Sequence, residues 1–177
     1  YHVVVASTPI GGTGVTVDGF AITGGNANGT SNLTVSGNAI SSDAGGAIFS
    51  TSGDITLTNN TLSANSAIGK GGAVFLFSGI NLLTNNTLLG NTADLGGGIY
   101  AFFSTNTLTN NTLSGNSARY GGGIFSQGSN NTFKNNTLSA NSGSVSGGGI
   151  YTYQGTDTVT NCIFWDNLQQ GSSTGVG

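Results

Sequence analysis

The residues that could catalyse a reaction are few in this chain, and they are far apart in the sequence. A calcium-dependent polysaccharide lyase needs clustered acids beside a basic residue, and a glycoside hydrolase needs two carboxylates about 5 to 10 Å apart. The acidic residues are instead scattered aspartates: Asp18, Asp43, Asp54, Asp94, Asp157 and Asp166. The single histidine, His2, lies too near the first residue to support a Ser-His-Asp triad. We therefore expect no enzymatic activity, no metal site and no cofactor.

Composition excludes several other classes of protein. With three basic residues the chain has no patch for binding nucleic acid. A net charge of −3 with 36% hydrophobic residues is not typical of a disordered protein. The longest apolar run, residues 99–103, is far too short to insert into a membrane. Only 5% of residues are charged, so Asn, Ser and Thr must supply solubility, which favours an extracellular or cell-surface location.

Two motifs recur with a period of about 25 residues. The first places an apolar residue two positions after an asparagine, at Ile40, Leu62, Leu88, Leu113, Leu138 and Ile163. The second places Ile or Val after Gly-Gly-Ala or Gly-Gly-Gly, at Ile48, Val74, Ile99, Ile124 and Ile150. Residues 15–26 fit as an earlier, degenerate copy with Ile22 aligned to Ile40. This period indicates a solenoid, and the skeleton of leucine-rich repeats is absent.

Alternation within each repeat predicts three short strands per coil. In residues 99–102, for example, successive side chains point to opposite faces of one strand. We therefore predict an all-β fold, a parallel β-helix solenoid of about seven coils that forms a single domain over residues 1–177. Its expected parts are a partial N-terminal coil, the repeat coils and a flexible C-terminal tail, at 1–14, 15–166 and 167–177.

The repeated asparagine lies two positions before the apolar residue, so its side chain should point to the same side, the interior. Stacked about 4.8 Å apart in successive coils, each amide can donate to one neighbouring coil and accept from the other. The predicted internal asparagine ladder is Asn38, Asn60, Asn86, Asn111, Asn136 and Asn161. A second column lies at a turn, where Asn tolerates left-handed geometry. It contains Asp43, Asn65, Asn91, Asn116, Asn141 and Asp166.

These motifs resemble the GGA(I/L/V) and FxxN repeats of polymorphic outer-membrane proteins and related bacterial right-handed β-helix surface proteins. The first motif stands at 45–48, 71–74, 96–99, 121–124 and 147–150, and FxxN matches fully at 133–136. The last coil departs from the pattern, because Thr158 falls where the apolar residue should be and Val159 indicates a one-residue deletion. The resemblance implies a right-handed coil in a secreted or surface-displayed, often adhesive protein without a cofactor.

Two outward columns could bind a ligand. The aromatic column is Phe49, Phe75, Tyr100, Phe125 and Tyr151. It forms an exposed stripe for stacking sugars if Ile48 and its equivalents face inward, or fills the core if the parity is reversed. The second column carries Thr or Ser at 61, 63, 87, 112, 114, 137 and 139. Such rows are typical of ice-binding solenoids, but Ala39, Leu89 and Cys162 interrupt them, and we expect Cys162 to be an exposed thiol.

Seven N-x-S/T sequons mark possible glycosylation sites, at Asn28, Asn32, Asn59, Asn85, Asn110, Asn130 and Asn135. The repeat offers another explanation, because an inward Asn column beside an outward Thr column produces the same tripeptide.

We therefore expect a non-enzymatic extracellular structural or adhesive element, with a carbohydrate-binding surface or an ice-binding surface as alternatives. The sequence begins with strand-like residues 3–5 and ends in the polar stretch 169–177, so neither strand edge has a cap. Either the chain is a piece of a longer solenoid, or copies assemble head to tail or laterally into a filament. The expected partners are other copies of the chain or surface glycans.

Overall fold

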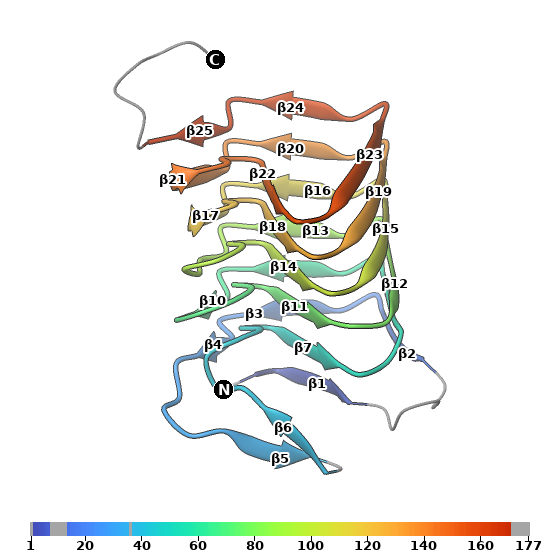
Figure 1. Cartoon of the computed structure of the whole chain (residues 1–177), viewed down its shortest axis with the longest axis vertical. Coiled ribbons are helices and arrows are strands. Elements are labelled where there is room, and N and C mark those ends of the chain that lie inside the picture. Colours follow the sequence, from blue (N-terminus) through green and yellow to red (C-terminus); the bar gives the residue numbers. More distant parts are fainter. Residues whose placement is uncertain (1, 8–13, 36, 171–177) are drawn as a thin grey trace.

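The computed structural model describes residues 2–7, 14–35 and 37–170. Over these residues the chain winds into a stack of coils, with the successive strands lying above one another (Figure 1). Every regular element in the described ranges is a β-strand. Three long parallel sheets run through the stack, and each takes one strand from every coil.

Each of the three long sheets contains six strands, which stack in chain order. The first sheet contains β1 (Val4–Ser7), β7 (Ile48–Thr51), β11 (Val74–Phe77), β14 (Ile99–Phe102), β18 (Ile124–Gln127) and β22 (Ile150–Tyr153). The second contains β2 (Val15–Asp18), β8 (Ile55–Thr58), β12 (Ile80–Thr84), β15 (Thr105–Thr109), β19 (Asn130–Lys134) and β23 (Thr156–Thr160). The third contains β3 (Ala21–Thr23), β9 (Thr61–Ser63), β13 (Thr87–Leu89), β16 (Thr112–Ser114), β20 (Thr137–Ser139) and β24 (Ile163–Trp165). Two small parallel sheets are formed by β4 (Asn26–Ala27) with β10 (Ser66–Ala67), and by β17 (Ser117–Tyr120), β21 (Ser142–Ser146) and β25 (Leu168–Gln169).

The predicted parallel β-helix with three strands per coil is confirmed, but the number of coils is smaller than predicted. Each long sheet has six strands, so the described chain makes about five turns between its first and last coil, and not about seven. The surplus predicted coil is an insertion. β5 (Leu33–Val35) and β6 (Asn38–Ile40) form an antiparallel hairpin beside the N-terminal end of the stack (Figure 1). Ile22 consequently pairs with Leu62, and Ile40 does not belong to that column.

The register of the last coil also differs from the prediction. Ala118 pairs with Gly143, but Tyr120 pairs with Ser146, so the later coil holds one extra residue between these positions. Every following position is shifted by one, and Leu138 pairs with Phe164 and not with Ile163. The predicted deletion is therefore wrong.

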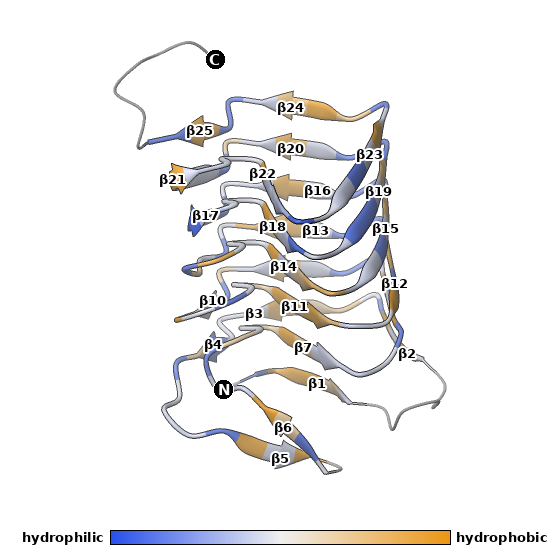
Figure 2. Ribbon diagram, viewed as in Figure 1, coloured by the Kyte–Doolittle hydropathy of each residue, from blue (hydrophilic) through white to orange (hydrophobic). Residues whose placement is uncertain are grey.

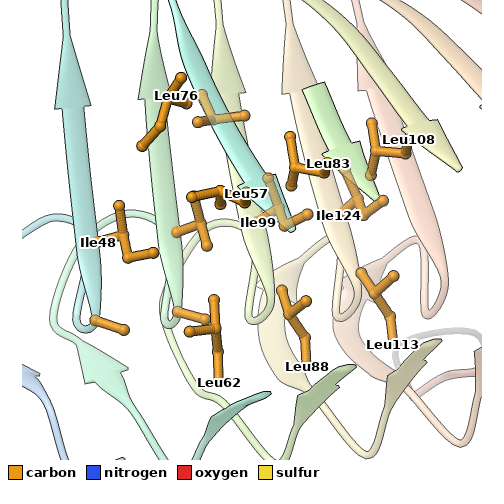
Figure 3. Packing of buried hydrophobic residues seen from close by; sticks show 14 of the residues in the cluster. Ile48, Leu57, Leu62, Leu76, Leu83, Leu88, Ile99, Leu108, Leu113 and Ile124 are labelled. Atoms are coloured by element: carbon orange, nitrogen blue, oxygen red, sulfur yellow. The ribbon is translucent and has the colours of Figure 1, made fainter. Parts of the chain in front are cut away.

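Inward side chains from all three sheets fill the interior. Figure 3 shows isoleucines and Leu76 of the first sheet and leucines of the second and third sheets gathered in this space. Those labelled are Ile48, Leu57, Leu62, Leu76, Leu83, Leu88, Ile99, Leu108, Leu113 and Ile124. Each fully buried side chain of this size contributes about 1.5 to 3 kcal/mol, so the stacked columns are the main source of stability.

Glycine is required where neighbouring coils approach most closely. A Cβ atom at Gly97 would lie 2.4 Å from the carbonyl oxygen of Ser117 and 2.5 Å from that of Gly122. Both contacts are with backbone, which cannot move aside, so the glycine pairs of the repeat permit the stacking itself.

The aromatic column lies between two layers of the protein. Ile48 and its equivalents do face the interior, so the aromatic side chains point outward, as the first alternative predicted. They are nevertheless buried or half-buried, because Ala44, Leu95 and Tyr120 belong to a second hydrophobic cluster that packs over them. Successive rings stack with centroids 4.9, 5.5, 5.2 and 5.3 Å apart along Phe49, Phe75, Tyr100, Phe125 and Tyr151. The prediction of an exposed stripe is wrong, and so is the reversed parity.

Candidate functional site

The asparagines of the first ladder directly precede the strands of the third sheet. Their side-chain amides form hydrogen bonds with the neighbouring coils. Asn111 shows the pattern: its Nδ2 donates to the Leu83 carbonyl at 2.8 Å and to Asn136 Oδ1 at 3.0 Å. Its Oδ1 accepts from the backbone N–H and the Nδ2 of Asn86, at 2.8 and 3.1 Å. The same arrangement links Asn60, Asn86, Asn111 and Asn136.

Two predicted members of this ladder are elsewhere. Asn38 lies in the inserted hairpin, where its Nδ2 donates to the Ser7 hydroxyl at 2.7 Å. Asn161 is exposed at a turn with φ of 51°, because the extra residue in β21 moves it out of register. Cys162 takes the ladder position in the last coil, and its Sγ accepts from the Asn136 backbone N–H at 3.4 Å. Its thiol is half-buried, so the expectation of an exposed, outward-facing cysteine is wrong.

Two further ladders complete the interior. The predicted turn column forms one of them, but its members are Asn65, Asn91, Asn116, Asn141 and Asn167, without Asp43 or Asp166. The other lies on the second sheet and joins Asn81, Asn106, Asn131 and Asp157. This ladder was not predicted, although its signal in the sequence is an Asn two positions before a buried Leu or Phe on that strand.

Among the described residues, the polar side chains of the interior are engaged in hydrogen bonds. No buried side-chain nitrogen or oxygen in that part of the chain lacks a hydrogen-bond partner, and no three His, Cys, Asp or Glu residues lie together there. His2 has its Nδ1 2.8 Å from the Gly45 carbonyl oxygen and its ring 5.2 Å from that of Phe49. Burial raises the pKa of Tyr100 to about 12, and its hydroxyl donates to Gln127 Oε1 at 2.7 Å. These groups have structural contacts.

The outward face of the second sheet carries two aligned rows of side chains that are mostly threonine, and we name it the threonine face. One row contains Thr16, Thr56, Leu82, Thr107, Thr132 and Thr158. The adjacent row contains Asp18, Thr58, Thr84, Thr109, Lys134 and Thr160. All of these side chains are exposed or half-exposed. The sheet sets their spacing at about 4.8 Å between coils and about 6.6 Å along a strand.

Three positions interrupt the two rows: Asp18, Leu82 and Lys134. The strand that carries Leu82, β12, is largely hydrophobic, whereas β19 and β23 are hydrophilic over most of their length (Figure 2). In the two rows themselves, Leu82 on β12 is the one apolar side chain.

The predicted Thr and Ser rows lie on the third sheet and are less regular. Thr61, Thr87, Thr112 and Thr137 form one row, which ends in Ala21 and Ile163. The predicted interruptions at Ala39 and Cys162 are wrong, because neither residue belongs to this row. The T-x-T pattern at 56–58, 107–109 and 158–160 was the signal for the more regular face on the second sheet.

The seven sequon asparagines are all exposed: Asn28, Asn32, Asn59, Asn85, Asn110, Asn130 and Asn135. Four of them occupy left-handed turn positions between the second and third sheets, with φ of 54 to 56°. Asn85 Nδ2 donates to Asn59 Oδ1 at 3.3 Å, so the two side chains bond to each other along the surface of this turn. Their glycosylation stays a prediction.

The fold and the positions of these residues define a parallel β-helix whose interior is filled by stacked apolar side chains and by asparagine ladders. A family model described as "Right handed beta helix region" matches residues 6–164, so the chain belongs to this family. No curated protein and no solved structure matches the chain. Within the described residues, no helix has the length and hydrophobicity needed to cross a membrane.

Proposed function

We propose that the protein is a non-enzymatic, extracellular scaffold that adheres to hydroxyl-rich surfaces through its threonine face. The observation that carries this proposal is the pair of aligned threonine rows on the second sheet. Each threonine offers a hydroxyl that both donates and accepts hydrogen bonds, beside a methyl group that excludes water. Such a surface suits polysaccharide chains, which alternate hydroxyl and C–H groups.

Rigidity supports this role. The three ladders and the stacked core hold the β-strands under the face in one register, so threonines as distant in the sequence as Thr16 and Thr158 keep a constant spacing. β-Branched side chains also lose little rotational freedom on binding. Several weak contacts made at once give a much higher combined affinity than any single one.

The distribution of ionisable groups supports a non-enzymatic role. Asp157 is engaged by Asn131 Nδ2 at 2.7 Å and by the Thr152 hydroxyl, and it therefore continues the ladder of the second sheet. Asp18 accepts from Asn59 Nδ2 at 3.0 Å. A surface with few charges and rich in Thr, Asn and Ser supports an extracellular location, as does the resemblance to the repeats of polymorphic outer-membrane proteins.

Adsorption to insoluble polysaccharide tests the proposal. The folded protein is mixed with cellulose or chitin, and both its depletion from solution and the release of reducing ends are measured. We expect depletion without new reducing ends. The double variant Thr107→Asp/Thr132→Asp should lose adsorption, because close contact would strip water from two carboxylates in the middle of the face. The matched control, Thr87→Asp/Thr112→Asp on the third sheet, should adsorb like the parent protein.

Two results would overturn the proposal. Release of reducing ends would make the protein an enzyme. Equal adsorption by the two double variants, or no adsorption of the folded parent to either solid, would remove the threonine face as the adhesive surface.

The same rows favour a second candidate, binding to ice. A flat array of hydroxyl and methyl groups at fixed spacing can order water at its surface, and this array is longer than the one predicted on the third sheet. Thermal hysteresis of a solution of the chain measures this activity directly. A freezing point equal to the melting point at high protein concentration would exclude it.

End-to-end assembly is a separate candidate for the structural role. At one end of the stack an apolar cavity of about 450 Å³ is lined by residues that include Val3, Val15 and Phe20. At the other end Val159 and Phe164 are exposed although they hold inward positions. Sedimentation velocity of this chain over a range of concentrations tests whether copies stack through these ends, and a monomer at every concentration would exclude it.

A further inference from the structure

A cleft lined by aromatic residues opens where the aromatic column reaches the last coils. It has a volume of about 230 Å³, and its walls are Leu95, Tyr120, Phe125, Tyr151 and Tyr153. We name it the tyrosine cleft. The ring of Tyr151 stacks on that of Phe125 at 5.3 Å, and the ring of Tyr120 is tilted by 47° against it at 5.6 Å. Tyr153 is 47% exposed.

The cleft lies where the row that covers the aromatic column reaches a small polar residue. In successive coils the aromatic column is covered by a row that pairs Ala44, Lys70, Leu95 and Tyr120. The next residue in this row is Ser146, which pairs with Tyr120 after the extra residue in β21. A serine cannot cover an aromatic ring as Leu95 and Tyr120 do, so the side of Tyr151 stays open.

Polar groups surround the aromatic walls. The hydroxyl of Tyr100, deeper in the column, is occupied by Gln127. By contrast, no hydrogen bond within the described residues occupies the hydroxyls of Tyr120, Tyr151 and Tyr153. The guanidinium carbon of Arg119 lies 5.3 Å from the centroid of the Tyr120 ring, which adds donors beside the cleft.

The size and chemistry of the cleft fit one sugar ring. Its volume is below the roughly 300 to 1,000 Å³ of sites for drug-sized ligands. Aromatic faces match the C–H face of a pyranose, while phenol hydroxyls can bond to the ring's hydroxyl groups. A purely apolar ligand would leave these hydroxyls without partners inside the complex.

We propose that the tyrosine cleft is a carbohydrate-binding site for a single pyranose unit, stacked against Tyr153 and hydrogen-bonded to the hydroxyls of Tyr120 and Tyr151. This site is separate from the threonine face and does not depend on its function. It recognises a soluble sugar or the end of a glycan chain, whereas the threonine face would contact an extended solid.

Saturation-transfer NMR with methyl glucoside, methyl galactoside, N-acetylglucosamine and glucuronate tests the proposal. We expect saturable transfer to at least one of these sugars, with a Kd on the order of 1 to 10 mM for one stacked ring. Tyr153→Ala should weaken binding at least about tenfold, because it removes the exposed stacking ring. Tyr153→Phe keeps the ring and should change the Kd by less than about threefold.

Two further variants separate the cleft from general surface effects. Ser146→Leu should close the cleft in the way that Leu95 does, and should abolish binding without lowering the unfolding midpoint. Phe103→Ala removes another exposed aromatic ring, 60% accessible and outside the cleft, and should leave the Kd unchanged. The proposal is overturned if no sugar shows saturable transfer to the folded parent, or if Tyr153→Ala and Ser146→Leu bind like the parent. Adsorption to cellulose or chitin is measured separately, so the proposal for the tyrosine cleft and the proposal for the threonine face can be rejected independently.

Discussion

The central coils and the last coil share one register but differ sharply in burial. Phe133 and Leu138 are fully buried, whereas their partners in the next coil, Val159 and Phe164, are 48% and 46% exposed. All four are apolar and hold inward positions. The difference is that β19 and β20 have a strand on each side, while β23 and β24 have one neighbour among the described residues.

This comparison shows that a coil does not bury its own interior. A strand contributes inward side chains, but the coils above and below exclude the water. The ladders behave in the same way, since Asn136 is bonded to the coils on both sides and Asn167 donates within the stack but has no described coil beyond it. Stability in this molecule should therefore fall toward the last coil.

The largest expected effect comes from truncating a central aromatic side chain. Phe133→Ala should lower the free energy of unfolding by about 4 kcal/mol, because it leaves a cavity between fully packed coils. Phe164→Ala should cost about 1 kcal/mol, because half of that side chain already contacts water. Equilibrium unfolding in urea measures both. Similar losses for the two variants would contradict the dependence of burial on the next coil.

Breaking a ladder in the central coils should lower the free energy of unfolding nearly as much as Phe133→Ala does. Asn111→Ala removes partners from Asn86, from the Leu83 carbonyl and from Asn136, and should destabilise by about 3 kcal/mol. The neighbouring half-exposed Thr112 provides the control, and Thr112→Ala should stay within about 0.5 kcal/mol. If chemical denaturation gave equal losses for the pair, the bonds of the ladder would not be a source of stability.

Alkaline pH should act on the central part of the aromatic column. The pKa of Tyr100 is raised from 10.0 to about 12 by burial, so the folded state keeps its proton where the unfolded state loses it. Stability from this group is complete below pH 10 and falls as the pH rises to about 12, by roughly 2 to 3 kcal/mol. Tyr100→Phe should reduce this fall, measured as the pH dependence of the unfolding midpoint. An unchanged slope in the variant would contradict the assignment to Tyr100.

The smallest expected effect is a gain in stability from a substitution in the last coil. Cys162 holds a ladder position with long contacts to Asn136, 3.4 Å to its backbone N–H and 3.8 Å to its Nδ2. Cys162→Asn should shorten these contacts and stabilise the protein by about 1 kcal/mol. Cys162→Ser, with a side chain too short for the ladder, should give no gain in a thermal unfolding experiment. A gain with serine equal to that with asparagine would show that loss of the thiol, and not the ladder, is responsible.

Much of the architecture could be predicted because equivalent positions in successive repeats carry equivalent residues. Asn60, Asn86, Asn111 and Asn136 were placed correctly, since a ladder needs the same residue at the same position in successive coils. The prediction failed at Asn38 and Asn161, where a hairpin and one extra residue break the period. A single sequence cannot show whether a spacing of 22 or 26 residues is a short coil, an insertion or a bulge.

The candidate surfaces were harder to predict than the fold. Alternation along each strand separates the side chains of its two faces; it placed Thr112 outward correctly and left both orientations of Phe125 open. It does not indicate whether another segment lies outside the strand. Phe125 is covered by a second layer, whereas Thr112 remains half-exposed.

By itself the sequence determined the period, the stacking of parallel strands, the inward parity of the repeated Leu and Asn, and the glycines that permit close approach of the coils. These properties depend on contacts between residues one repeat apart in the sequence, and the same residue types recur in each repeat. The tertiary structure alone decided which outward residues meet solvent, because that depends on segments joined by no period, such as the covering row that ends at Ser146. The exposed threonine face and the tyrosine cleft both follow from this packing between segments.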